Sequence, residues 1–287
     1  MLVLCIAGAA GAAAALATSG GGATRTHAST SQTRPFRPAS HRRGGLGATI
    51  ATGNAEIRRL AGFDLPLYCG GHRGNEVAFT FDDGPGVYTN LALKKLGQAH
   101  ERATFFVVGK SMNAFPGFLP RELALGTIGD HTYTHPDLVA LSPAEVDFQL
   151  ARTAQMIRAQ TGQEVDLWRP PYEADDAAVR QVAHRLGLLE ILWSIDSRDS
   201  LGADWAQIIS TVEAGLRPGT IVLFHENHGQ TIRALTTLLP YLHSHRLRSV
   251  SLPELLASDP PSIAQLRAGA TGCGGSTALK SAGHAGG

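Results

Sequence analysis

The chain has 287 residues, a formal net charge of +1 and 43% hydrophobic residues. This length and apolar content suffice for one large domain with a full core or for two small domains. The near-zero net charge gives no reason to expect nucleic acid as a partner. Cysteines occur at Cys5, Cys69 and Cys273, and because no Cys-x-x-Cys pair exists, a zinc finger built on thiolates is excluded.

The N-terminal residues have the character of an export signal. Residues 2–16 are almost entirely apolar and rich in Ala, and the small-residue pattern Ala15-Leu16-Ala17 predicts cleavage after Ala17. The run is short for a membrane span. No Lys or Arg precedes it, so an uncleaved anchor and a lipid-modified Cys5 are alternatives. With a signal peptide over residues 1–17, we expect a secreted or cell-envelope-associated protein.

A basic, Gly/Ser/Thr-rich segment follows, and we interpret residues 18–65 as a linker. Residues 18–55 contain arginines but no acidic residue. Such a composition does not bury enough apolar surface to fold. A plain linker is one interpretation, and a basic arm that contacts an anionic polymer of the cell envelope is the other.

From Leu65 onward, strand and helix patterns alternate. The expected strands cover residues 77–81, 104–108, 127–129, 166–169, 188–195, 220–224 and 248–250. The expected helices cover residues 91–98, 117–125, 143–160, 176–186, 205–216, 231–243 and 253–257. The helix 143–160 has Ser142 as its N-cap and apolar residues at helical spacing. This alternation predicts an α/β fold with a parallel sheet and outer helices, open or closed into a barrel.

The composition changes again after Pro260-Pro261. Residues 268–287 are mostly Gly, Ala and Ser and are predicted to be disordered, so we place the folded domain at 66–258 and a Gly-rich tail at 259–287. In an exported protein, Cys69 and Cys273 would be the mature thiols, and a disulfide between them would pin the tail to the start of the domain. Two unpaired thiols are the alternative.

Two adjacent acids, Asp82 and Asp83, follow the apolar run of the first expected strand, and a Gly-Pro pair then turns the chain. At a strand end, two carboxylates can converge on one pocket, where they repel each other unless a cation or a proton lies between them. Asp-Gly is also ordinary turn chemistry. Taken alone, the pair therefore has a plain structural explanation.

His131 and His135 are four residues apart. At this spacing two imidazoles can face one side of a helical turn and bind a metal. Together with Asp83 they would form a site of two histidines and one carboxylate, with a coordination position open for water, which is typical of catalytic zinc. Two surface histidines are the alternative explanation.

Further motifs follow later strands. The segment 168–172, WRPPY, offers Arg169 to clamp a carboxylate and the backbone N–H of Tyr172 to face an oxyanion. Asp199 lies just after the strand 188–195, and the strand 220–224 is followed by His225. An acid near His225 would raise its pKa and make it a general acid. A buried loop arginine and a core histidine are the alternatives. All these groups follow expected strands, at the sheet edge where active sites of parallel α/β proteins collect.

As an ordered set, these motifs resemble those of the polysaccharide deacetylases, the NodB-like carbohydrate esterase family four. The similarity covers residues 66–257. It implies a distorted (β/α) barrel of about seven parallel strands with a metal site at its C-terminal rim. It also implies a hydrolase of linear amides that removes N-acetyl, in some members O-acetyl, groups from a glycan such as peptidoglycan, chitin oligomers or xylan. One divalent metal ion, usually Zn²⁺, is the implied cofactor.

The resemblance also assigns a role to each matching residue. Asp83, His131 and His135 would be the metal ligands. Asp82 would be the general base, oriented by Arg169. A nearby carboxylate can take the proton of a water whose pKa the metal has lowered, so these roles are chemically consistent.

The remaining roles lie on the side of the leaving group. His225 would be the general acid, because the departing amine must be protonated, and Asp199 would keep it charged near neutral pH. Tyr172 would bind the substrate and stabilise the oxyanion through its N–H. Leu223 would line the pocket for the acetyl group.

Two positions depart from the family pattern. Ser200 stands where Trp is usual, which removes an apolar wall of the groove, and Asp130 stands where Asn is common. The leading hypothesis is an exported, monomeric deacetylase whose partner is an acetylated polysaccharide. One rival is an inactive relative of the same fold that only binds glycan. Another is a phosphoesterase, which would want more positive charge at the rim than Arg169 and Arg198 provide.

Overall fold

The computed structural model describes residues 43–274, which contain one parallel sheet. Its strands are β1 (Glu76–Gly84), β2 (Ala103–Val107), β3 (Gly126–Asp130), β4 (Leu167–Trp168), β5 (Leu189–Glu190), β6 (Ile195–Asp196), β7 (Ile221–His225) and β8 (Arg248–Ser249). They are hydrogen-bonded in the order β5-β4-β3-β2-β1-β7-β6, and β8 pairs with the start of β1. The predicted α/β fold with about seven parallel strands and outer helices is confirmed.

The segment 189–196 contributes strands to both edges of the sheet. The single strand expected at 188–195 is two short strands, because β5 pairs with β4 whereas β6 pairs with β7. Leu67 adds a bridge to Ile191, and Cys69 adds one to Thr220. The stretch from Leu189 to Asp196 thus connects the two edges of the sheet, so that the sheet curls into a barrel.

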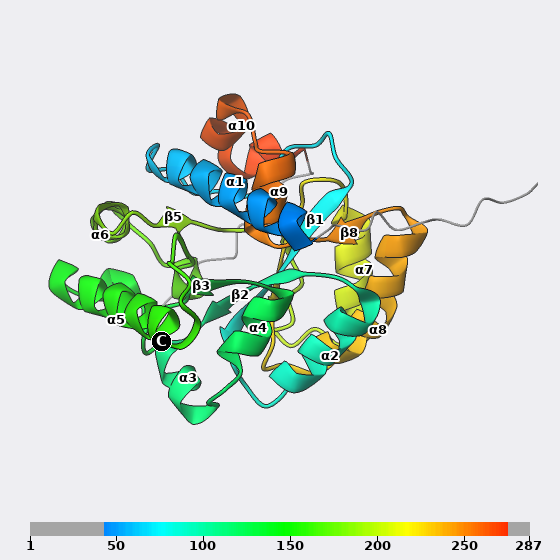
Figure 1. The fold of residues 1–287 in the computed structure, drawn as a ribbon, viewed down its shortest axis with the longest axis horizontal. Helices are drawn as coiled ribbons and strands as arrows, with labels where there is room; N and C mark the ends of the chain where they lie inside the picture. Colours follow the sequence, from blue (N-terminus) through cyan, green and yellow to red (C-terminus); the bar gives the residue numbers. More distant parts are fainter. Residues whose placement is uncertain (1–42, 275–287) are drawn as a thin grey trace, which may run out of the picture. The chain divides into compact units, whose positions relative to one another are not determined.

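Helices surround the curled sheet (Figure 1). They are α1 (Arg43–Ala61), α2 (Thr89–Ala99), α3 (Gly109–Ala114), α4 (Leu119–Leu125), α5 (Pro143–Thr161), α6 (Ala177–Arg185), α7 (Trp205–Gly215), α8 (Gly229–Ser244), α9 (Leu252–Ser258) and α10 (Ile263–Ala268). Ser142 caps α5 with a capping box, as its sequence predicts. Within residues 43–274, none of these helices is long and apolar enough to cross a membrane.

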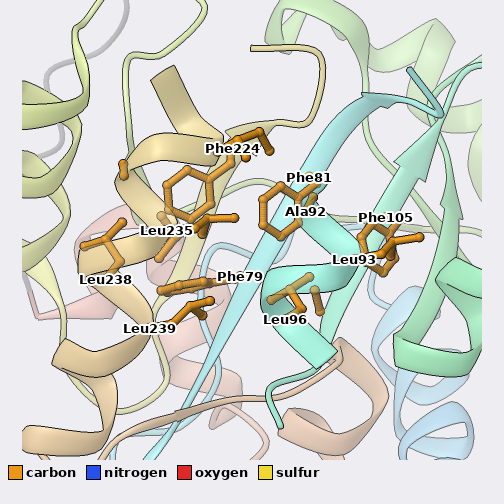
Figure 2. Packing of buried hydrophobic residues seen from close by; sticks show 14 of the residues in the cluster. Phe79, Phe81, Ala92, Leu93, Leu96, Phe105, Phe224, Leu235, Leu238 and Leu239 are labelled. Carbon is orange, nitrogen blue, oxygen red and sulfur yellow. The ribbon is translucent and has the colours of Figure 1, made fainter. Parts of the chain in front are cut away.

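Alternate side chains of β1 point to two different environments. Phe79 and Phe81 point to the outer face, where they pack with Phe224 of β7 under leucines of α2 and α8, as Figure 2 shows. The ring centroids of Phe81 and Phe224 are 5.4 Å apart. Burial of such a side chain stabilises the fold by about 1.5–3 kcal/mol. Because alternate strand residues point to opposite faces, Thr80 and Asp82 face the barrel interior.

Helix α1 corrects the linker prediction. Residues 43–61 are helical, and Ile57 and Leu60 are buried in a core cluster that also contains residues of α9. Figure 1 shows α1 beside α9 and α10. The Gly-rich composition suggests a linker, but Gly53 is what permits contact: a Cβ there would lie 1.8 Å from the carbonyl oxygen of Pro253. Residues 1–42, with the predicted signal peptide and the rest of the linker, lie outside the described residues.

This contact predicts opposite effects for two glycines of α1. Gly53→Ala places a methyl group against the backbone of Pro253 and is expected to lower the free energy of unfolding by about 1–3 kcal/mol. At Gly47, a methyl group would meet no atom within 4 Å, so Gly47→Ala should gain up to about 1 kcal/mol from helix propensity. Urea denaturation of both variants measures the difference, and stabilisation by both would contradict this packing.

The segment after α9 is also more ordered than its composition predicts. After α10, residues Gly269–Cys273 form a 3₁₀ turn, and Cys273 forms a disulfide with Cys69. The guanidinium of Arg217 donates to the carbonyl oxygen of Cys273 at 2.7 Å. The predicted disorder of the tail is therefore wrong for residues 268–273, because the disulfide fixes them to the domain. Residues 275–287 lie outside the described range.

Candidate active site

A bulge at the end of β1 turns two adjacent carboxylates to one side. The pairing of β1 with β2 shifts register between Asp82 and Gly84, and Asp83 has a left-handed backbone with φ 71°. Neighbouring strand residues normally point to opposite faces, and the extra residue of a bulge re-aims one of them. Oxygens of Asp82 and Asp83 consequently lie 3.7 Å and 3.6 Å from Nε2 of His131.

His131 and His135 follow β3 in a loop. The helical turn that their spacing suggests does not form, because Thr132 and His135 both have positive φ values, 68° and 59°. Their Nε2 atoms are nevertheless 3.2 Å apart. Nδ1 of His131 lies 2.8 Å from the carbonyl oxygen of Arg169, which can only accept, so Nδ1 carries the hydrogen and Nε2 presents its lone pair. Nδ1 of His135 lies 3.1 Å from the hydroxyl of Tyr172.

These atoms form a triangle that fits one cation. Oδ1 of Asp83 lies 3.1 Å from Nε2 of His135 and 3.6 Å from Nε2 of His131. In a tetrahedral zinc site with bonds of about 2.0–2.1 Å, ligand atoms are about 3.3 Å apart. Oδ1 of Asp83 is buried and accepts no hydrogen bond from the described residues, which leaves it for a cation. Burial lowers the pKa of His131 and so favours the neutral ring that a metal requires.

Asp82 is held by Arg169 rather than by this triad. Both side chains are buried, and Nη1 of Arg169 donates to Oδ1 of Asp82 at 2.7 Å and to the hydroxyl of Thr80 at 2.9 Å. The guanidinium also stacks on Phe106, with 4.2 Å from Cζ to the ring centroid. A charge-assisted hydrogen bond from a buried, stacked guanidinium fixes the carboxylate in place. Oδ2 of Asp82 is the oxygen that faces His131.

Asp199 and His225 form a second pair, at the ends of β6 and β7. Oδ1 of Asp199 lies 2.7 Å from Nδ1 of His225, and Oδ2 accepts from the backbone N–H of His225 at 2.7 Å. Burial alone lowers the pKa of His225, but Asp199, with the charges of Asp82 and Asp83, raises it to about 9. His225 is therefore a cationic donor near neutral pH.

Two further predicted residues lie on the same rim. Tyr172 is 70% exposed and has a left-handed backbone with φ 61°, a conformation that concentrates at functional sites. Leu223 is buried in β7, two residues before His225, and so lies on the same face of that strand. The structure thus brings all the predicted site residues to the carboxyl ends of β1, β3, β4, β6 and β7.

Two hydroxyl groups that the sequence analysis did not identify support the Asp82–Arg169 and Asp199–His225 pairs. Thr231 of α8 is buried and donates to Oδ2 of Asp199 at 2.5 Å. Thr80 accepts from Arg169 and donates to the carbonyl oxygen of Val222 at 2.7 Å. The two-residue period of β1 places Thr80 on the face of Asp82, so it was detectable in the sequence. Thr231 was not, because a threonine in the first turn of a helix is common.

Glu226 is a buried acid that the sequence patterns also missed. A Cβ at Gly84 would lie 1.3 Å from Oε1 of Glu226, so this glycine is required for close approach and not only for the turn. Burial, assisted by the charges of Asp83 and Asp82, raises the pKa of Glu226 to about 8. Burial therefore disfavours a third negative charge beside the two aspartates.

Asp130 and Ser200, the two departures from the family pattern, lie in different surroundings. Asp130 is fully buried, and its Oδ1 accepts from the backbone N–H of Thr132 at 2.7 Å, which shapes the loop between the two histidines. Burial raises its pKa well above the usual range. Ser200 is exposed, and its backbone N–H donates to Asp199 at 2.8 Å.

Comparison with known proteins identifies relatives of this chain. Residues 70–191 match the family model described as polysaccharide deacetylase. The peptidoglycan-N-acetylglucosamine deacetylase PgdA of Listeria monocytogenes serotype 1/2a (strain 10403S) is 38% identical over 181 residues, which cover 62% of this chain and 38% of that protein. The chitooligosaccharide deacetylase of Bradyrhizobium sp. (strain ANU 289) is 35% identical over 196 residues, which cover 62% of this chain and 90% of that protein. The chain thus spans well under half of the first relative and most of the second.

Solved structures agree with the sequence comparison. The Bc1960 peptidoglycan N-acetylglucosamine deacetylase superposes with a TM-score of 0.64 at 30% identity, over 67% of this chain and 92% of that one. BA3943 of Bacillus anthracis, a pseudoenzyme of carbohydrate esterase family four, superposes with a TM-score of 0.62 at 29% identity, over 67% and 68% of the two chains. The family model and the 35% identity over 90% of the chitooligosaccharide deacetylase show that this chain belongs to the polysaccharide deacetylase family.

Proposed function

We propose that this protein is a metal-dependent hydrolase that removes N-acetyl groups from an N-acetylglucosamine-containing polysaccharide, such as peptidoglycan or a chitin oligomer. One observation carries the proposal: a three-ligand cation site shares one rim with a clamped carboxylate, Asp82, and with a histidine, His225, whose Nδ1 lies 2.7 Å from the Asp199 carboxylate. The names of the peptidoglycan and chitooligosaccharide relatives support the choice of substrate. O-acetyl groups, as on xylan, are the alternative within the same chemistry.

The cofactor that we propose is one Zn²⁺ ion held by Asp83, His131 and His135. When bound, it lowers the pKa of a water molecule and polarises the acetyl carbonyl. Two imidazoles and one carboxylate leave the coordination position that such catalysis needs. The carbonyl of Arg169 and the hydroxyl of Tyr172 orient the two rings for this task.

The side chains divide the proton transfers between them. Asp82 accepts a proton from the attacking water, and Arg169 holds this carboxylate in position. The backbone N–H of Tyr172 donates to the oxyanion as the carbonyl carbon becomes tetrahedral. When the C–N bond breaks, His225 gives its proton to the leaving amine, so the products are acetate and a free amino sugar. Leu223 lines the space for the acetyl methyl group.

We further propose that the protein works outside the cytoplasm. The disulfide between Cys69 and Cys273 supports this, because such bonds persist in oxidising compartments. The predicted signal peptide, the basic residues before α1 and an anionic envelope polymer as their partner belong to the same proposal.

The proposal predicts acetate release that depends on the cation. Purified protein incubated with an N-acetylglucosamine hexamer should release acetate, dipicolinate should abolish the release, and added Zn²⁺ should restore it. Enzymatic quantification of acetate measures the reaction. Release that resists the chelator would contradict the metal site. Binding of the hexamer without any release would favour the inactive, glycan-binding alternative, for which the neighbouring pseudoenzyme is a precedent.

A further inference from the structure

The loop that follows β6 has two sides with different surroundings. Its buried side carries Asp199, whose carboxylate holds His225. Its outer side carries Arg198 and Leu201, and Leu201 is 70% exposed. The backbone N–H groups of Leu201 and Ala203 both donate to the carbonyl oxygen of Arg198 at 3.1 Å. This tight turn links the outer surface directly to the residues of the candidate active site.

An open groove of about 740 Å³ begins at this outer side and continues along α7. Besides Arg198 and Leu201, its lining includes Gln207, Ser210 and Thr211 of α7. The volume lies within the range of about 300–1,000 Å³ that is usual for ligand clefts. None of these residues belongs to the catalytic set, so the groove is separate from the acetyl pocket.

The chemistry of the groove suits a carbohydrate. The hydroxyls of Ser210 and Thr211 have no hydrogen-bond partner within residues 43–274. Gln207 uses its Oε1 to accept from the N–H of Asp204 at 2.9 Å, which leaves its amide NH₂ group as a donor. Leu201 offers an apolar surface next to these polar groups. Sugars present hydroxyls at their edges and C–H groups on their faces, and this lining can contact both.

Other ligand classes fit less well. A nucleic acid would require a surplus of cations, whereas the lining of the groove contains one cation, Arg198, and one anion, Asp204. A protein partner would favour a broad apolar patch, whereas Leu201 is the single large apolar side chain among the groove residues described.

We propose that the α7 groove binds a stretch of the polysaccharide chain next to the sugar that loses its acetyl group. The inference rests on the proposed function and extends it to the length of the substrate. Arg198 lines the groove and directly precedes Asp199, which holds His225, so a glycan that lies in the groove passes within one residue of this pair. Occupation of the groove makes long chains better substrates than short ones.

Chain-length dependence tests this role. Leu201→Ala removes the apolar surface, and Ser210→Trp fills the groove from the exposed side of α7. Each is expected to lower kcat/KM for an N-acetylglucosamine hexamer about tenfold and to change kcat/KM for the dimer by less than about twofold. The matched controls Leu186→Ala and Gln181→Trp alter exposed residues at α6 and should change neither value. Equal losses on the two oligomers, or no loss on either, would overturn the proposal.

A binding measurement separates this inference from the proposed function. Calorimetric titration of the hexamer into an Asp82→Asn protein measures affinity without turnover, and adding Ser210→Trp should weaken that affinity about tenfold. If the wild-type protein releases no acetate, the proposed function fails, and the same titration still decides about the groove. Unchanged affinity in the Ser210→Trp protein would reject the groove while leaving the deacetylase proposal intact.

Discussion

Replacement of Asp82 by Asn is expected to lower kcat for acetate release by about 10²–10⁴-fold without loss of the metal. Asn has nearly the same shape and still accepts a hydrogen bond from Arg169, but it cannot take a proton from water. The metal should remain because Asp83, His131 and His135 form the ligand triangle without Asp82. Steady-state kinetics combined with metal analysis of the purified variant measures both effects.

The control for this variant is Asp64→Asn, at an exposed position just after α1, which should leave kcat and metal content unchanged. Circular dichroism must accompany the kinetics, because loss of the carboxylate leaves the buried charge of Arg169 less well paired. Full activity of the folded Asp82→Asn protein would refute the base assignment. An inactive variant that has also lost its metal would mean that Asp82 acts as a ligand.

Asp199→Asn is expected to move the alkaline limb of the pH–rate profile to lower pH. His225 must be protonated to donate to the amine, and its pKa of about 9 lets activity persist until the pH rises through that value. Without the Asp199 carboxylate, the pKa should return toward its usual value of about 6.5, so the variant should lose most of its activity near pH 8. A bound cation would offset the charges of Asp82 and Asp83. Asp199 is then the group that keeps the pKa of His225 high.

The same pair predicts how stability depends on pH. The pKa of His225 is higher in the folded protein than in the unfolded chain, so its contribution is complete below about pH 6.5 and declines as the pH rises through about 9. Thermal melts should show wild type and Asp199→Asn converging across this window. Thr231→Val, which removes only the hydrogen bond to Oδ2, should shift the rate profile less. An alkaline limb that is identical in all three proteins would show that His225 is not the acid.

The sequence predicts the alternation of strands and helices well, because buried parallel strands and amphipathic helices have different periods. It does not show where one strand changes partners. The run 188–195 is uniformly apolar, and its division into β5 and β6 depends on which distant strand each half meets. The sequence does not predict helix α1 either, because its glycines suggest a flexible segment. The value of Gly53 becomes clear only from the backbone of Pro253, which lies against it in the folded chain.

In the candidate active site, too, the spacing of residues in the sequence predicts which residues meet but not the conformation that brings them together. The distance in sequence between His131 and His135 indicates a shared metal, but the loop that joins them depends on the buried side chain of Asp130. Strand ends place Asp199 and His225 on one rim, whereas Thr231 reaches that rim only through the packing of α8. Ordered motifs therefore predict which residues meet, and the supporting groups require the folded chain.

The bulge in β1 ties two chemical tasks to one peptide unit. Asp83 binds the cation in the proposed mechanism and Asp82 activates the nucleophile, yet no rotatable loop separates them. Any displacement of the cation along the pocket is transmitted to the base within one residue. The extra residue is Asp83 itself, so deleting it would restore regular pairing and at the same time remove the carboxylate proposed to bind the cation; a single codon separates this reaction centre from an ordinary strand.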